Sequence, residues 1–142
     1  MKQLFVHIGT HKTGTTSIQR FCIENKDALK KEGIYFIEHH DFAVNHNFRD
    51  IKQKEIIIQS LKKILDKSVQ VNQDKIFLCW EGFSGNAMNF YDDRDNLLSI
   101  LKSSIPEGIT LTIILFLRRQ DQFLQSMYTQ ALHQQDFKYA EK

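Results

Sequence analysis

The sequence predicts an α/β fold in which a parallel sheet of about four strands is covered by helices on both faces, giving three layers. Short apolar, β-rich runs alternate four times with longer segments of helical periodicity. One run, residues 110–117 (TLTIILFL), is almost continuously apolar, which is typical of a strand buried on both faces of a parallel sheet. Alternating strands and helices imply right-handed βαβ crossovers, so the strands should end at a common edge.

Length and composition fit one folded domain. The chain has 142 residues, of which 42% are hydrophobic and 11% aromatic, and its single proline is Pro106. This composition argues against disorder, and the length suffices for one continuous core. We therefore expect a single domain over residues 1–142.

The charge balance limits the classes of partner. Nineteen Lys and Arg residues against seventeen Asp and Glu residues give a formal net charge of +2, too balanced to predict nucleic acid or an anionic membrane as partner. No apolar run approaches membrane-spanning length, and the N-terminal apolar stretch is too short for a signal peptide. Cys22 and Cys79 fall in a predicted helix and a predicted buried strand, without the spacing of a metal site. We expect a cytoplasmic protein with reduced thiols and no metal.

The first strand is expected at residues 3–8, ending at Gly9, and a helix should run from Thr15 to near Gly33. Its buried face would carry Ile18, Phe21, Cys22 and Leu29. A second strand is expected at residues 34–37. The polar stretch that follows contains His39, His40 and His46, which lack a zinc-like ligand set and are interpreted as loop residues.

The second half of the chain continues the alternation. An amphipathic helix is marked by Ile57, Leu61, Ile64 and Leu65. A third strand should span residues 75–80, and a helix about residues 92–103, ended by Pro106 and Gly108. After the fourth strand a last helix presents an apolar stripe that is predicted to be core: Leu124, Met127, Tyr128, Ala131 and Leu132.

The first strand leads into the segment GTHKTGTT, residues 9–16. A glycine-rich turn between a strand and a helix presents free backbone N–H groups at the positive end of the helix dipole, which suits an anion. The segment has the GxxxxG frame of a P-loop, so the sheet is expected to be P-loop-like. However, Thr15 stands where a nucleoside triphosphatase requires lysine, and the lysine is Lys12 instead.

Two further polar side chains are expected at the same edge of the sheet. Glu81 follows the third predicted strand, and Arg118 follows the fourth. Ligands of open α/β sheets bind beyond the carboxyl ends of the strands, where these residues and the loop would meet. Glu81 is the best-placed carboxylate to act as a general base, although a strand-end carboxylate can also simply cap a turn.

Two motifs resemble those of the PAPS-dependent sulfotransferases, where PAPS is 3′-phosphoadenosine 5′-phosphosulfate. The run Lys12-Thr13-Gly14-Thr15-Thr16 resembles the family's 5′-phosphosulfate loop. Arg118 at the end of a strand, with Ser126 eight positions later, is similar to the pair that holds the 3′-phosphate. The flanking LRRQDQFLQSMYTQ looks like the version in bacterial carbohydrate-type enzymes, and the resemblance runs from residue 3 to about residue 135.

The resemblance implies a metal-free sulfuryl transfer from PAPS to a hydroxyl of a small molecule or glycan. The implied catalytic residues are Lys12, Glu81 and His11, with His7 as a further rival for the base. The cofactor would be bound by the loop and the first turn of the helix, together with the arginine-serine pair: Lys12, Thr13, Gly14, Thr15, Thr16, Ser17, Arg118 and Ser126. Arg119 is interpreted as the outward neighbour of Arg118.

Members of this family continue past the arginine-serine motif with further elements of the cofactor and acceptor sites. We therefore expect this chain to be truncated at its C-terminal end relative to the family, which leaves open whether it is active alone. Two alternatives are a nucleotide kinase-like P-loop enzyme and a non-catalytic nucleotide-binding fragment. The sequence also leaves open the acceptor and whether the chain forms a homo-oligomer.

Overall fold

A computed structural model describes residues 2–38, 51–85, 91–92 and 94–133 of the protein. It contains a four-stranded, entirely parallel sheet, which confirms the predicted α/β class. The strand order is β2-β3-β1-β4, so β1 lies between β3 and β4. The strands are β1 (Gln3–His7), β2 (Ile34–Ile37), β3 (Lys75–Cys79) and β4 (Thr110–Ile114).

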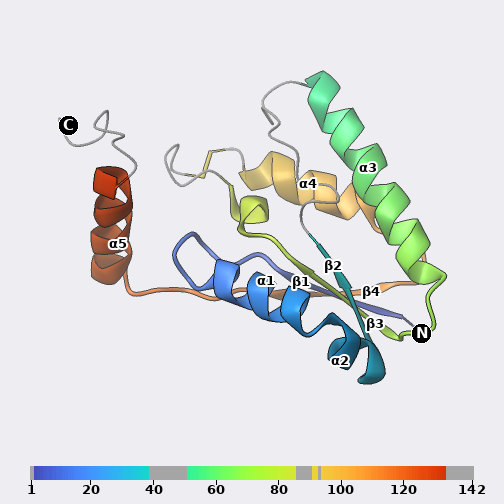
Figure 1. Ribbon diagram of the computed structural model, residues 1–142. Helices are drawn as coiled ribbons and strands as arrows, with labels where there is room; N and C mark the ends of the chain where they lie inside the picture. Colours follow the sequence, from blue (N-terminus) through green and yellow to red (C-terminus); the bar gives the residue numbers. More distant parts are fainter. Residues whose placement is uncertain (1, 39–50, 86–90, 93, 134–142) are drawn as a thin grey trace.

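Helices cover both faces of the sheet (Figure 1). Helices α1 (Thr15–Glu24) and α2 (Lys26–Lys31) lie on one face, whereas α3 (Ile51–Val69) and α4 (Arg94–Ser104) lie on the other. A 3-10 helix, Glu81–Ser84, follows β3, and α5 (Gln120–His133) follows β4. Among the described helices, none combines the length and apolar character needed to cross a membrane.

The pleat of the strands divides the core between the two faces. Alternate residues of β1 and β3 point toward α3 and α4, where they form the larger cluster with Leu61, Leu65 and Leu101. The residues between them point toward α1, where Cys79 packs with Phe36 and Cys22. The larger cluster takes Leu4, Val6, Ile76 and Leu78 from the two strands, each fully buried.

The predicted helix from Thr15 to near Gly33 is two helices, because the chain breaks at Asn25. Asn25 has φ −113° and ψ 25°, and its side-chain Nδ2 donates to the carbonyl of Phe21 at 2.9 Å. The backbone N of Asn25 donates to the same carbonyl at 3.0 Å, so Asn25 satisfies this carbonyl twice at the end of α1. Cys22 and Cys79 lie in a helix and a strand as predicted, and both are buried and free. His39, His40 and His46 lie outside the described residues.

The prediction of a doubly buried strand over residues 110–117 is wrong. The strand ends at Ile114 and forms an edge of the sheet, with β1 as its neighbour. Leu111 and Ile113 are 37% and 42% exposed. The predicted core stripe of the last helix is also exposed, since no other described element packs extensively against α5. Leu124, Tyr128 and Leu132 are 66%, 59% and 43% exposed.

Substitution of Leu78 tests which apolar side chains contribute most to the free energy of unfolding. The Leu78 side chain is fully buried in the central β3, and we expect Leu78→Ala to cost about 2–5 kcal/mol of unfolding free energy, because it leaves a cavity beneath α3 and α4. Leu98→Ala on α4, where the side chain is 36% exposed, is the control and should cost less. Urea denaturation measures both, and equal costs would contradict the assigned core.

Candidate functional site

The loop between β1 and α1 has a defined backbone shape. Its start is tethered to the chain after β4, because Ile8 N donates to the Ile114 carbonyl at 3.0 Å and Thr10 N to the Phe116 carbonyl at 3.4 Å. The Thr13 hydroxyl closes the loop internally by donating to the Thr10 carbonyl at 2.6 Å. The Thr13 side chain is therefore used to shape the loop.

Two residues of the loop have left-handed backbone conformations. Gly14, the N-cap of α1, has φ 87°, which suits glycine. Lys12 has φ 66°, which is uncommon for a residue with a Cβ. Strained conformations of this kind persist where the surrounding structure imposes them, and they gather at ligand-binding sites. Lys12 is therefore held in a special conformation within the loop.

The N-terminus of α1 has no side-chain cap. The first-turn N–H groups therefore lack a capping side chain at the positive end of the helix dipole. Thr15 is 5% exposed, and its Oγ1 has no hydrogen-bond partner among the described residues. Thr16 and Ser17 follow in the first turn and are exposed. The arrangement provides donors for an anion where the side chains of the protein do not satisfy them.

His7 forms the floor beneath the loop. It is 1% exposed, its Nδ1 lies 3.2 Å from Cys79 Sγ, and its ring meets the Phe116 ring edge-on at 4.8 Å. A Cβ on Gly9 would lie 2.9 Å from the His7 ring and 2.7 Å from Thr13 Oγ1, so this position requires glycine. Burial under the loop removes His7 from contact with an acceptor molecule.

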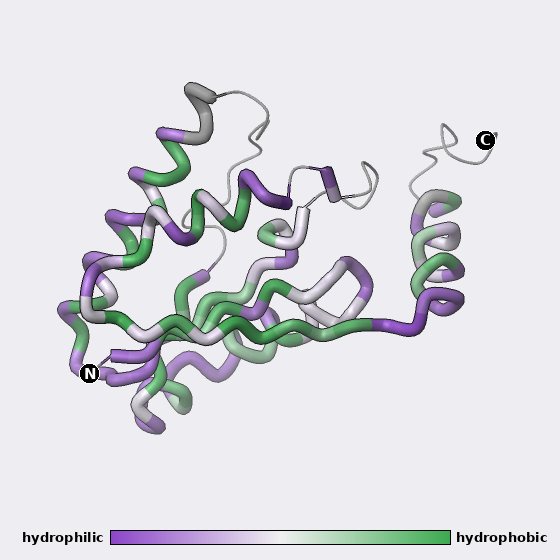
Figure 2. Tube along the Cα trace, turned by 180° about the vertical axis from the view of Figure 1, so that it is seen from behind, coloured by the Kyte–Doolittle hydropathy of each residue, from purple (hydrophilic) through white to green (hydrophobic). Residues whose placement is uncertain are grey.

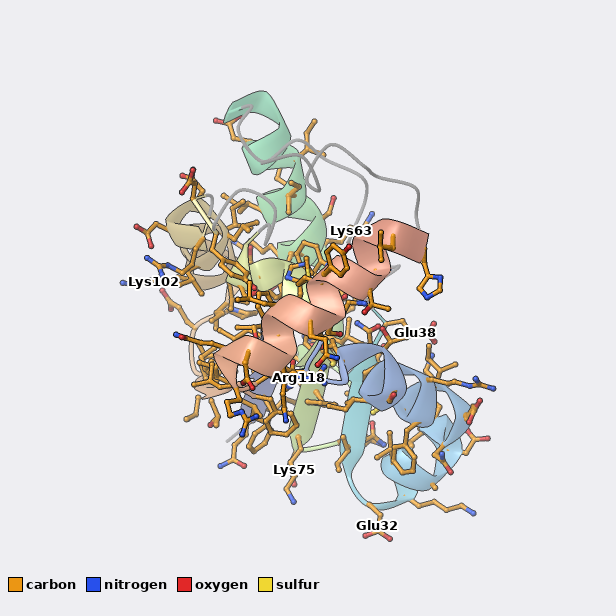
Figure 3. All side chains as sticks on the ribbon, turned by 90° about the vertical axis from the view of Figure 1, so that its left-hand side faces the viewer. Glu32, Glu38, Lys63, Lys75, Lys102 and Arg118 are labelled. Atoms are coloured by element: carbon orange, nitrogen blue, oxygen red, sulfur yellow. The ribbon has the colours of Figure 1, made fainter. Side chains whose placement is uncertain are left out.

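Arg118 and Lys12 meet although 106 positions separate them in the sequence. Arg118 Nη1 donates to the Lys12 carbonyl at 3.1 Å, and Figure 3 shows Arg118 between α5 and the beginning of α1. Lys12, Arg118 and Ser126 line one open cavity of about 640 Å³. Three residues singled out from two separate sequence motifs are thus brought to one place.

The sequence reasoning missed the rest of this cavity's lining. It comes from the polar face of α5: Gln122, Gln125, Thr129, Gln130 and His133. Most of these positions repeat at helical spacing from Ser126, so the periodicity could have identified them. Arg119 does not line the cavity, because its guanidinium pairs with Asp121 through two hydrogen bonds of 2.6 Å. This agrees with its interpretation as the outward arginine.

Gln19 is a second residue that sequence reasoning missed. It is 7% exposed within α1, and its Nε2 donates to the Cys79 carbonyl at the end of β3 at 3.0 Å. This bond attaches the beginning of α1 to the neighbouring strand and so orients the helix N-terminus. A glutamine between the apolar Ile18 and Cys22 was the available signal.

Glu81 and His11 are outside the lining of the cavity shared by Lys12, Arg118 and Ser126. Glu81 begins the 3-10 helix after β3, and its Oε2 is buried without a hydrogen-bond partner among the described residues. The ring of His11 lies 6.0 Å from that of Tyr91, centroid to centroid. His11 thus belongs to the loop itself, and the Glu81 carboxylate acts electrostatically on His7 beneath the loop, whereas neither residue lines the arginine-serine side of the site.

Burial controls the ionisation of the groups under the loop. It lowers the pKa of His7 below its ordinary value, although the nearby Glu81 carboxylate opposes this effect. Burial, with smaller contributions from Cys22 and Glu81, raises the pKa of Cys79 to about 12. Cys79 is therefore a protonated thiol near neutral pH, which argues against a role as nucleophile.

No known protein-family model matches this chain, and no curated protein is detectably similar to it. The function must therefore be argued from the site itself.

The lowered pKa of the buried His7 leads to a prediction about how the free energy of unfolding depends on pH. The folded state lowers its pKa below the ordinary 6.5, so the unfolded chain binds the proton more readily and stability falls as the pH drops through that value. We expect the unfolding free energy of His7→Gln to decrease less than that of the wild type between about pH 7.5 and pH 5.

The matched control is His133→Gln, because this imidazole lies on the exposed surface of α5. Urea denaturation at each pH measures all three proteins. Parallel wild-type and His7→Gln profiles would show that His7 does not resist protonation in the fold.

Proposed function

We propose that the protein binds PAPS and transfers its sulfuryl group to a hydroxyl acceptor, such as a carbohydrate. The observation that carries this proposal is the single cavity lined by Lys12, Arg118 and Ser126. Two cationic side chains and a hydroxyl there adjoin an uncapped helix N-terminus. This is an arrangement for a ligand with more than one anionic group.

The cavity and the helix N-terminus beside it suit the two ends of such a nucleotide. The N-terminus of α1, with Thr15 and Lys12, would receive the 5′-phosphosulfate through backbone and charge-assisted hydrogen bonds. Arg118 and Ser126 would hold the 3′-phosphate. Arg118 donates one N–H to the Lys12 carbonyl. A guanidinium has five N–H groups in total, so Arg118 retains donors for a phosphate.

The donor supplies an activated sulfuryl group, and the protein supplies position and charge. Lys12 and the N–H groups of the loop would stabilise the negative charge that develops on the phosphate oxygen as it leaves. These donors are fixed before the reaction by the hydrogen bonds that shape the loop, so little reorganisation is needed when the charge appears.

Glu81 is the proposed base. The Glu81 residue is partly exposed at the beginning of the 3-10 helix, so an acceptor hydroxyl could donate a hydrogen bond to its carboxylate before giving up its proton. His11 is the rival, because it belongs to the loop itself. His7 is the weaker candidate, since it is buried beneath Gly9 and Thr13.

Ligand preference separates this proposal from the two alternatives. We expect 3′-phosphoadenosine 5′-phosphate (PAP) without magnesium to raise the melting temperature more than Mg²⁺–ATP does, because both its phosphates meet protein donors. Lys12→Ala should remove most of the shift, since it deletes the loop's lysine. Differential scanning fluorimetry measures both.

A larger shift with Mg²⁺–ATP would favour a nucleotide kinase-like enzyme instead. Binding of PAP without PAP release from PAPS in the presence of a panel of hydroxylated acceptors would favour a non-catalytic binding module.

Arg118 and Ser126 should set the preference for PAP over 5′-AMP, because the two ligands differ only in the 3′-phosphate. Loss of a hydrogen bond to a charged group costs about 1.5–3 kcal/mol, so Arg118→Ala and Ser126→Ala should each reduce the ratio of affinities roughly tenfold or more. Isothermal titration calorimetry gives the ratio.

Arg119→Ala is the matched control, because Arg119 pairs with Asp121 and does not line the cavity. Its PAP to 5′-AMP ratio should stay at the wild-type value. If Arg118→Ala and Ser126→Ala kept that ratio as well, the 3′-phosphate would have to bind elsewhere.

A further inference from the structure

One of the two edges of the sheet is formed by β4, and the other by β2. Thr110 N donates to the Lys2 carbonyl, and the Ile114 carbonyl accepts from Ile8 N, so the backbone groups of these residues point toward β1. Backbone groups alternate in direction along a strand. The N–H and C=O groups of Leu111 and Ile113 therefore point away from β1, at the open edge.

This edge lacks the features that normally prevent association. Edge strands are usually protected by charges, prolines, bulges or a covering element. The nine residues 109–117 (ITLTIILFL) contain no charge, proline or glycine, and Figure 2 shows this apolar stretch running the length of β4 and beyond it. The exposed fractions of its large side chains are 37% for Leu111, 42% for Ile113, 49% for Leu115, 48% for Phe116 and 75% for Leu117.

Helix α5 follows this apolar stretch in the chain. It has 14 residues, and an isolated helix of this length is only marginally stable in water. No other described element packs extensively against it, and Figure 1 shows it standing apart from the other helices. Its residues 122–132 carry no acidic or basic side chain, and three of its large apolar side chains are exposed, namely Leu124, Tyr128 and Leu132.

We propose that this β4–α5 face, formed by residues 109–117 and the apolar side of α5, is the interface of a homodimer. A two-fold axis perpendicular to the sheet would pair the two β4 strands antiparallel and join the sheets into one. The outward N–H and C=O groups of Leu111 and Ile113 would then bond to the partner strand. The same operation places like faces together, so apolar side chains meet apolar side chains.

The chemistry of the face favours a second copy over a different partner. The occupant must offer an extended strand edge, an apolar surface and no requirement for opposite charge. Close to a two-fold axis each charge lies beside its own symmetry copy, so the central part of a self-complementary face must be almost uncharged. Residues 109–117 and 122–132 meet this condition. A shallow groove along α3, by contrast, is lined by Lys62, Lys63, Asp66 and Lys67.

The oligomeric state in the absence of any ligand tests the proposal. Sedimentation equilibrium of the wild type should fit a monomer–dimer equilibrium. Ile113→Lys should weaken the dimer at least tenfold, because it places a charge next to its own copy at the pairing edge. Leu117→Lys, at a 75% exposed position beyond the strand, should act in the same direction. Ile56→Lys on α3, at a 51% exposed apolar position, is the matched control and should dimerise like the wild type.

Hydrogen exchange of the wild type provides a second measurement that needs no variant. The amides of Leu111 and Ile113 should be protected at high protein concentration and should exchange faster on dilution. The amide of Thr110, which is bonded to Lys2, should be protected in both conditions.

Four results would overturn the proposal. A wild type that is monomeric at every concentration would exclude it, as would open-ended association without a dimer plateau. Dimerisation of both lysine variants at wild-type strength would move the interface elsewhere. A monomer that binds neutral phosphatidylcholine vesicles through residues 109–117 would assign the face to a lipid surface instead.

Discussion

The candidate site depends on the position of β1 in the middle of the sheet. Because β1 pairs in parallel with both β3 and β4, His7 lies in register with Cys79 on one side and with Ile114 on the other. The chain segments that leave these three strands therefore start at the same height. The loop between β1 and α1 follows the first of them, Glu81 follows β3, and Arg118 follows β4. Parallel pairing alone brings together residues from three separate parts of the sequence.

Several features of this edge are unfavourable for stability unless a ligand is bound. Lys12 has a left-handed backbone conformation, Thr15 Oγ1 is buried without a partner among the described residues, and Glu81 Oε2 is in the same situation. Each feature alone can occur in a protein at a place where no ligand binds. Their concentration around one loop, beside an uncapped helix, is typical of a site whose hydrogen bonds are completed by a ligand. The core beneath α3 and α4, in which Leu61, Leu78 and Phe83 are almost fully buried, can offset these costs.

Sequence reasoning predicted the elements that have a local signal. The strands at residues 3–8 and 34–37 and the helix near residues 92–103 were recognisable from periodicity and from glycine or proline at their ends, and the structure confirms them within a few residues. The break at Asn25 was not predictable in this way, because no glycine or proline marks it and only the backbone angles of Asn25, φ −113° and ψ 25°, reveal it.

The exposure of β4 shows a different limit. An apolar run such as residues 110–117 shows that a segment avoids water, but it does not identify the element that covers the segment. The same applies to Leu124 and Tyr128 on α5. The stripe was correctly read as apolar, and it was wrongly assigned to the core of this domain because the described residues provide nothing to pack against it. Periodicity gives the face of a helix, and only the tertiary structure gives its neighbour.

The loop side and the α5 side of the proposed site are held in place by different parts of the structure. Lys12 and Thr15 are held by the sheet, the loop hydrogen bonds and the attachment of Gln19 to β3. Ser126, in contrast, belongs to a helix whose apolar side is open. A hydroxyl contributes strongly to anion binding only when its position is fixed beforehand, because otherwise binding must also order the helix that carries it. Packing of the apolar side of α5 against a second copy would order this helix without occupying its polar face, so dimerisation would strengthen the arginine-serine half of the cavity.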